Sequence, residues 1–206
     1  MKTIQLSAAA LIAAFTLATA TTASAFDGAI MGKVTVVKSE SKKFQLHIPK
    51  TMTQGSGAVQ VSLIDVDGTT LFTGTVIDRT QKGVPFDVAS LPDGKYYLTT
   101  STNTWWSSQE LNIRDNALSI DDTKLTQIAR PTISTYAKNK LQVTIPTVNV
   151  ESTNVAIYNQ NDELVFVEEV AGNISRLDLN GLPEGAYTLT VGSDVKRFAE
   201  QIKVQK

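Results

Sequence analysis

The sequence has no cysteine and only one histidine, and its formal net charge is -1. Without cysteine, neither a disulfide nor a thiol-linked lipid is available, so the burial of apolar side chains has to stabilise the protein. His47 is the only candidate for a histidine-dependent triad, acid-base pair or metal site. The acidic and basic residues are nearly equal in number and interspersed, which predicts no nucleic-acid partner and no anionic membrane partner.

The remaining polar residues predict no catalytic, cofactor or metal site, and we expect the protein not to be an enzyme. His47 points outward from a predicted strand, and its counterpart in a second copy of the pattern is Thr144. Residues Asp65-Val66-Asp67-Gly68 resemble the opening of a calcium loop, but they lack the glycine and glutamate that such a loop needs at its sixth and twelfth positions. We interpret them as a hairpin turn. Asp87 and Asp178 could each accept backbone hydrogen bonds beside a turn or oppose unwanted strand pairing at an edge. They belong to different domains, so they do not form a glycosidase pair.

Long apolar runs are also scarce, because the only one extends from Ile4 to about Ala20. Lys2 precedes it and Ala23-Ser24-Ala25 follows it, which is typical of a removable signal peptide over residues 1-25. We expect cleavage before Phe26, no membrane-spanning segment afterwards, and export to the periplasm, the cell surface or the extracellular space.

One phrase occurs twice in the chain, as Leu91-Pro92-Asp93-Gly94-Lys95-Tyr96-Tyr97-Leu98 and as Leu182-Pro183-Glu184-Gly185-Ala186-Tyr187-Thr188-Leu189. In each copy the leucine should enter the core, and the proline and glycine suit a tight turn. The first tyrosine can then cover the end of the core while its hydroxyl reaches the backbone, as in the tyrosine corner of immunoglobulin-like sandwiches.

Alternating apolar and polar residues around the phrase repeat as well, and they predict about seven short strands per copy. The fold class is therefore all-β, with two tandem antiparallel immunoglobulin/fibronectin-like β-sandwiches. We place the first sandwich at residues 26-114, a linker at 115-130 and the second sandwich at 131-206. Regularly placed apolar residues in the linker suggest that it lies on one domain or adds a strand at the junction. The matching segments are 43-49 with 140-146, 61-64 with 155-158, and 86-88 with 177-179.

Five residues are candidates for contact with a protein or glycan partner. Trp105 and Trp106 are adjacent and face opposite ways on a strand, so one of them could be an exposed stacking platform or anchor. The alternative is that one fills the core and the other caps a hairpin or the domain junction. Tyr97 points outward nearby, and Ile64 and Tyr158 occupy matched outward positions that could mark a covered sheet face.

The second copy resembles the C-terminal sorting domain of Bacteroidetes proteins that are exported by the type IX system. The resemblance lies in residues 155-159, 164-165, 177-189 and 201-204, although the Asn-Pro usual in the first strand is absent. It implies a domain that directs crossing of the outer membrane and is often removed. Both copies are also similar to small periplasmic domains of unknown function from Bacteroides-like bacteria. This second resemblance covers nearly the whole mature chain, and we favour it because a sorting signal would not explain why the module occurs twice.

These observations predict an exported, non-catalytic protein of a Gram-negative bacterium with a role in binding, adhesion or envelope scaffolding. One alternative is that the second copy acts as a type IX sorting domain. The other is a carbohydrate-binding module that uses an exposed tryptophan.

Overall fold

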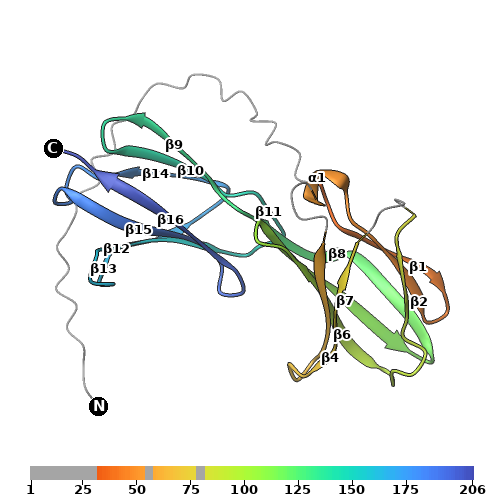
Figure 1. Ribbon diagram of the computed structural model, residues 1–206. Coiled ribbons are helices and arrows are strands. Elements are labelled where there is room, and N and C mark those ends of the chain that lie inside the picture. Colours follow the sequence, from red (N-terminus) through yellow and green to blue (C-terminus); the bar gives the residue numbers. More distant parts are fainter. Residues whose placement is uncertain (1–31, 54–57, 78–81) are drawn as a thin grey trace, which may run out of the picture.

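The computed structural model describes residues 32-53, 58-77 and 82-206. The signal peptide predicted at residues 1-25 lies outside the described residues. The described chain is almost entirely β-strand, with one short helix, α1 (Lys50–Thr53). No helix in the described ranges is long and apolar enough to cross a membrane. The strands form the predicted all-β fold of two consecutive antiparallel sandwiches, which lie end to end in Figure 1.

The first sandwich consists of two sheets. Strands β1 (Thr35–Glu40), β2 (Lys43–His47) and β5 (Val84–Asp87) form the smaller sheet in the order β1-β2-β5. The larger sheet contains β3 (Val59–Asp65), β4 (Thr70–Val76), β6 (Gly94–Ser101), β7 (Trp105–Arg114) and β8 (Ala117–Ala129). Its order is β11-β8-β7-β6-β3-β4. The edge strand β11 (Thr147–Val148) comes from later in the chain, after β9 and β10.

The second sandwich repeats this arrangement. Its three-stranded sheet has the order β14-β10-β9 and contains β9 (Thr132–Ala137), β10 (Lys140–Thr144) and β14 (Ile174–Asp178). Its four-stranded sheet has the order β13-β12-β15-β16 and contains β12 (Thr153–Tyr158), β13 (Leu164–Val170), β15 (Gly185–Gly192) and β16 (Arg197–Val204). Strand for strand, this is the order of β1 to β7 in the first sandwich, as the repeated sequence predicts.

Each sandwich has its own apolar core. Alternation places every second residue of a strand inward, as in β6, where Tyr96 and Leu98 are buried and Tyr97 between them is half-buried. Their counterparts Tyr187 and Leu189 are buried in the second core. Leu91 and Leu182 occupy equivalent places at the edges of the two cores. Both are partly buried, because the turn that follows each of them opens to solvent.

The repeated phrase forms a tyrosine corner in both copies. The Tyr96 hydroxyl donates a hydrogen bond to the carbonyl oxygen of Pro92, and the Tyr187 hydroxyl donates one to that of Pro183, each at 2.9 Å. Burial raises the pKa of Tyr96 above its usual value, with smaller contributions from Asp65 and Asp93. In each copy the hydroxyl hydrogen thus has an acceptor, and the hydrogen bond connects the turn to the strand that follows it.

The segment predicted as a linker forms strand β8, the extra strand at the junction. It pairs with β7 along most of its length and with β11 at its C-terminal end. Leu118, near its start, lies in the first core, and Ile128, near its end, lies in the second core. A single strand thus contributes a buried side chain to each sandwich. In Figure 1, β8 runs along the first sandwich beside β7 and reaches the junction near β11.

Candidate functional site

The polar residues of the calcium-loop-like segment and their counterparts in the second copy stabilise hairpin turns. Asp65 Oδ1 accepts hydrogen bonds from the backbone amides of Asp67 and Thr69 in the hairpin between β3 and β4. Asn159 Oδ1 makes the same pair of contacts in the second copy, with the amides of Asn161 and Glu163. The hairpin interpretation is therefore confirmed. No group of three potential metal-ligating side chains occurs in the described residues.

Asp87 and Asp178 are also turn residues, as predicted. Asp87 Oδ1 accepts a hydrogen bond from the Ala89 amide at 2.9 Å, and Asp178 Oδ1 accepts one from the Asn180 amide at 3.0 Å. The Asn180 amide, followed by Lys140 Nζ at 3.1 Å, lowers the pKa of Asp178 below its usual value. Both contacts favour the ionised carboxylate, so this residue has a structural role.

The two adjacent tryptophans separate into the two cores. Trp105 is only 3% exposed in the first core, where its indole nitrogen donates a hydrogen bond to the carbonyl oxygen of Met52 at 2.8 Å. Trp106 points to the other side of β7 and packs against the second core. Of the two alternatives derived from the sequence, the structure thus has the one in which one ring fills a core and the other lies at the junction.

A hollow of about 540 Å³ lies on the outer face of the first sandwich, next to the second one. Its floor is formed by neighbouring strands of the larger sheet. Tyr97 on β6 lies directly opposite Glu110 on β7, and Ser108 on β7 lies opposite Thr126 on β8. All four side chains line the hollow and are half-buried.

One wall of the hollow is an irregular stretch of β8. The pairing of β7 and β8 shifts between Gln109 and Leu111, so that residues 121-124 project as a bulge opposite Glu110. Gln109 Nε2 closes the bulge from inside with a hydrogen bond to the carbonyl oxygen of Asp121 at 2.9 Å. Thr123 donates to Asp121 Oδ1 from its hydroxyl at 2.6 Å and from its amide at 2.9 Å. These two bonds, the hydroxyl first, lower the pKa of Asp121.

A second wall comes from residues 149-151 after β11, which lead into the second sandwich. Asn149 Nδ2 donates hydrogen bonds to the carbonyl oxygens of Thr123 at 3.1 Å and Leu125 at 2.8 Å. Asn149 adopts a left-handed backbone with a φ of 49°, which asparagine accepts more readily than most residues. These contacts fix the wall from the second sandwich to the bulge of β8.

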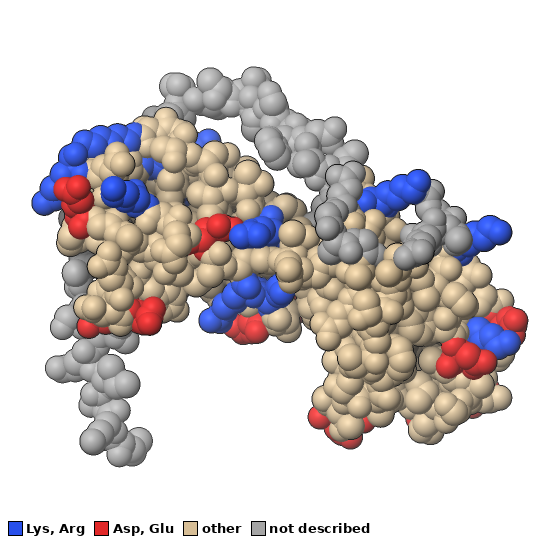
Figure 2. All heavy atoms as spheres, in the orientation of Figure 1, with Lys and Arg blue, Asp and Glu red and all other residues tan. Residues whose placement is uncertain are grey.

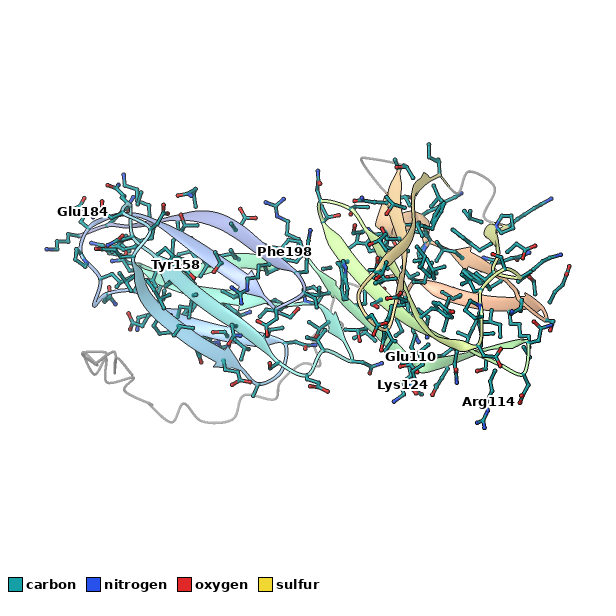
Figure 3. All side chains as sticks on the ribbon, turned by 90° about the horizontal axis from the view of Figure 1, so that it is seen from below. Glu110, Arg114, Lys124, Tyr158, Glu184 and Phe198 are labelled. Atoms are coloured by element: carbon teal, nitrogen blue, oxygen red, sulfur yellow. The ribbon has the colours of Figure 1, made fainter. Side chains whose placement is uncertain are left out.

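Charged side chains of both signs surround the hollow. Glu110, Glu151 and Lys124 line it, and Lys95 Nζ lies 3.6 Å from Glu110 Oε1. Figure 3 shows Glu110 and Lys124 beside one another on the first sandwich. In Figure 2, the blue and red side chains are interspersed over the visible face, with no large area of one sign. Around the hollow, the charges of Glu110 and Glu151 are therefore nearly balanced by those of Lys124 and Lys95.

The other predicted contact residues lie away from the walls of this hollow. Ile64 is half-buried and pairs with Tyr97 across β3 and β6, on the outer face of the same sheet. Tyr158 is half-buried on the outer face of the second sandwich, opposite Thr188. Of the five candidates, only Tyr97 lines the hollow.

Sequence reasoning missed the partners of Tyr97. Glu110, Lys124 and Glu151 belong to three separate segments, and no local motif connects them. The only signal was the segment 115-130 between the two copies, which matches neither of them, because an unrepeated segment is where the two copies can differ in function.

The second sandwich matches a known family, whereas no curated protein matches the chain. Residues 137-205 fit the family model described as the secretion system C-terminal sorting domain. This range runs from the last residue of β9 to just beyond β16, and thus includes nearly the whole second sandwich. The resemblance derived from the sequence is confirmed for this copy.

Three solved structures show similarity at low identity. The BSP domain of a biofilm-associated protein is 16% identical, with a TM-score of 0.28; the match covers 85% of this chain and 29% of that one. The FN1-FN3 domains of chicken CNTN1 are 10% identical, with a TM-score of 0.31; the match covers 84% of this chain and 64% of that one. A segment of two fibronectin type III domains from chicken tenascin is 13% identical, also with a TM-score of 0.31; the match covers 84% of this chain and 98% of that one. The chain spans less than a third of the first of these structures and less than two thirds of the second.

The family match and the fold together characterise the C-terminal part of the chain. Residues 137-205 match the family model of the secretion system C-terminal sorting domain and form a β-sandwich, and this match indicates export toward the cell surface or the extracellular space.

Proposed function

We propose that the chain is a non-catalytic binding or adhesion protein of a Gram-negative bacterial surface. In this proposal, the second sandwich is the sorting signal and the first sandwich is the delivered domain. The observation that carries it is the family match over residues 137-205, because that match is confined to one of two copies with the same topology. The copy without the match also holds most of the lining of the hollow.

The contacts of the polar residues favour binding over catalysis. The aspartates that the sequence made candidates for chemistry accept backbone hydrogen bonds in turns. His47 is half-buried on β2, and its imidazole lies beside Gly83, where an added methyl group would meet ring atoms at about 2.8 Å. A rigid sheet face with a hollow at its end is suited to holding a ligand.

The junction also favours display of the two sandwiches as one unit. The Arg130 guanidinium Nε donates a hydrogen bond to Glu200 Oε1 at 2.7 Å, and the Ala129 amide donates to the carbonyl oxygen of Pro146 at 2.9 Å. Together with the pairing of β8 and β11, these contacts oppose hinge motion between the sandwiches.

Surface labelling in a Bacteroidetes host tests the proposal. We would express the full chain in a strain with a working type IX system and in a matched strain without one, and detect it with antibodies to each sandwich. We expect protease-accessible protein on intact cells of the first strain only, and retention in the periplasm of the second. Intact periplasmic protein in both strains would refute the sorting role and favour a periplasmic scaffold.

A further inference from the structure

We propose that the hollow between the bulge of β8 and residues 149-151 is a binding site for a neutral glycan. The inference goes beyond the proposed function, because it names a site and a ligand class without depending on where the protein is delivered. The volume of about 540 Å³ lies within the range of small-molecule sites in proteins. The lining belongs to both sandwiches, so the site exists only in a chain that retains the second sandwich.

The chemistry of the lining selects a neutral polyhydroxylated ligand. Tyr97 offers the face of an aromatic ring, against which the apolar C-H face of a sugar can pack. Ser108 and Thr126 lie opposite each other on the floor and can both donate and accept hydrogen bonds. The carboxylates of Glu110 and Glu151 accept hydrogen bonds from sugar hydroxyls, and Lys124 donates to them.

The charges argue against an ionic ligand. Two carboxylates line the hollow, but Lys124 lines it as well and Lys95 lies 3.6 Å from Glu110. Neither a phosphate nor an acidic sugar meets an excess of positive charge, and a cation meets two ammonium groups. Val150 is the only aliphatic residue of the lining, so a lipid chain would find little apolar surface.

The arrangement also argues against an extended peptide that adds a strand to the sheet. The centre of the floor belongs to β6 and β7, which are paired along both sides in the six-stranded sheet. β8 pairs with β11 only at Gln127 and Ile128, but Asn149 Nδ2 occupies the carbonyl oxygens of Thr123 and Leu125, so a peptide would find no continuous free edge at the floor. Side-chain hydroxyls, carboxylates and one ring remain as the recognition groups, and these match a saccharide.

The walls are held in place before any ligand arrives. Asn149 bridges the two sides with its hydrogen bonds to Thr123 and Leu125, and Asp121 organises the bulge through Thr123. A site that is already ordered loses less conformational entropy on binding than a flexible loop does. This rigidity suits a weak, repeated surface contact with a polysaccharide.

Affinity electrophoresis of the mature full chain tests the site. The probes are neutral glucan, mannan, galactan and xylan in the gel, with polygalacturonate as the acidic comparison. We expect at least one neutral polysaccharide to retard the protein more strongly than polygalacturonate. We expect this retardation to change little between about 0.05 and 0.5 M salt, because screening weakens interactions between charges. Retardation by none of the neutral probes, or by polygalacturonate alone, would overturn the proposal.

Matched substitutions then locate the contact. Tyr97→Ala and Glu110→Gln should each weaken binding at least about tenfold, the scale of one lost hydrogen bond to a charged group or one lost aromatic contact.

Tyr158→Ala and Glu184→Gln are the controls, since both residues lie on the second sandwich away from the hollow (Figure 3). Equal losses in the controls, or unchanged binding in both site variants, would refute the assignment. Circular dichroism spectra of all four variants identify any that fail to fold. Delivery to the surface is measured separately, so failure of one proposal leaves the other distinguishable.

Discussion

Trp106 and Ile128 face each other across β7 and β8, and both pack against the core of the second sandwich although their strands belong to the first. The neighbour of each residue on its own strand points the other way, as Trp105 does into the first core. At this end of β7 and β8, the outer face of the larger sheet of the first sandwich therefore packs against the core of the second sandwich.

This relationship predicts that Ile128→Ala destabilises the second sandwich, although residue 128 precedes it in the chain. Ile128 is fully buried, and removal of its side chain should cost about 2-5 kcal/mol of unfolding free energy. Hydrogen exchange followed sandwich by sandwich would measure the effect. Leu118→Ala is the matched control, because Leu118 is 1% exposed in the first core. A loss of protection in the first sandwich alone after Ile128→Ala would contradict this packing.

The tyrosine corners predict a small, equal effect in the two copies. Tyr96→Phe and Tyr187→Phe each remove a hydroxyl that donates to a proline carbonyl, which should cost about 1 kcal/mol. Urea unfolding of the full chain measures both variants. Tyr136→Phe serves as the control, since Tyr136 is 53% exposed and its loss of a hydroxyl should change little. A larger effect in the control than in the corners would show that these hydrogen bonds contribute nothing to stability.

The first leucine of each repeated phrase should matter less for stability than the last leucine, which lies on the strand after the turn. Leu182 is only partly buried, whereas Leu189 is 0% exposed, so Leu189→Ala leaves the larger cavity. We expect Leu189→Ala to lower the melting temperature more than Leu182→Ala does, with the same ranking for Leu98 and Leu91 in the first copy. The reverse ranking would place the centre of the core at the turn.

Limited proteolysis tests the order of the junction. Asp121 lies in the bulge of β8, which Asn149 holds through two carbonyl oxygens, so the folded chain should resist rapid cleavage there. Asn149→Gly keeps the left-handed backbone accessible but removes both hydrogen bonds, and it should speed cleavage near residue 121. Asn149→Ala adds backbone strain and should speed it further. Rapid cleavage of the wild-type chain at this site would contradict an ordered junction.

The stability of the second sandwich should depend on the charge of Asp178 in acid. The folded state lowers the pKa of this residue from its ordinary value of 3.8, so the unfolded chain binds the proton more readily. The stabilisation is therefore complete above that value and is lost as the pH falls below it toward the lower pKa of the folded state. The carboxylate is half-exposed, so the effect should be small. Asp178→Asn keeps an oxygen acceptor for the Asn180 amide but has no carboxylate to protonate. The urea midpoint of this variant should therefore fall less than that of the wild type as the pH is lowered. Parallel plots of urea midpoint against pH for the two proteins would refute the linkage.

Much of the fold could be predicted from local patterns. Alternation between apolar and polar residues identified the strand that contains Tyr96 and the one that contains Tyr187, because the two faces of a strand meet different environments. The repeated phrase predicted both corners and their hydroxyl contacts with the backbone. The turn roles of Asp65 and Asp87 followed from the geometry of short side chains beside a turn.

The candidate site was harder to predict, because it joins segments that are distant in sequence. Tyr97 was identified by its outward position, but its opposite partner Glu110 depends on the pairing of two strands. Lys124 reaches the same hollow only through an irregular register, and Glu151 reaches it only through the docking of the second sandwich. Register and docking are long-range choices that no local composition encodes.

The sequence by itself determined that the chain folds as two copies of one sandwich, since periodicity and turn chemistry act over a few residues. Only the tertiary structure decided how the copies join and which tryptophan serves which core. Trp105 and Trp106 are identical in type and adjacent in sequence, and they differ only in what lies above each face of β7. That difference arises from the docking of β8 against β11, a contact between segments whose partners are set by the packing of the whole chain.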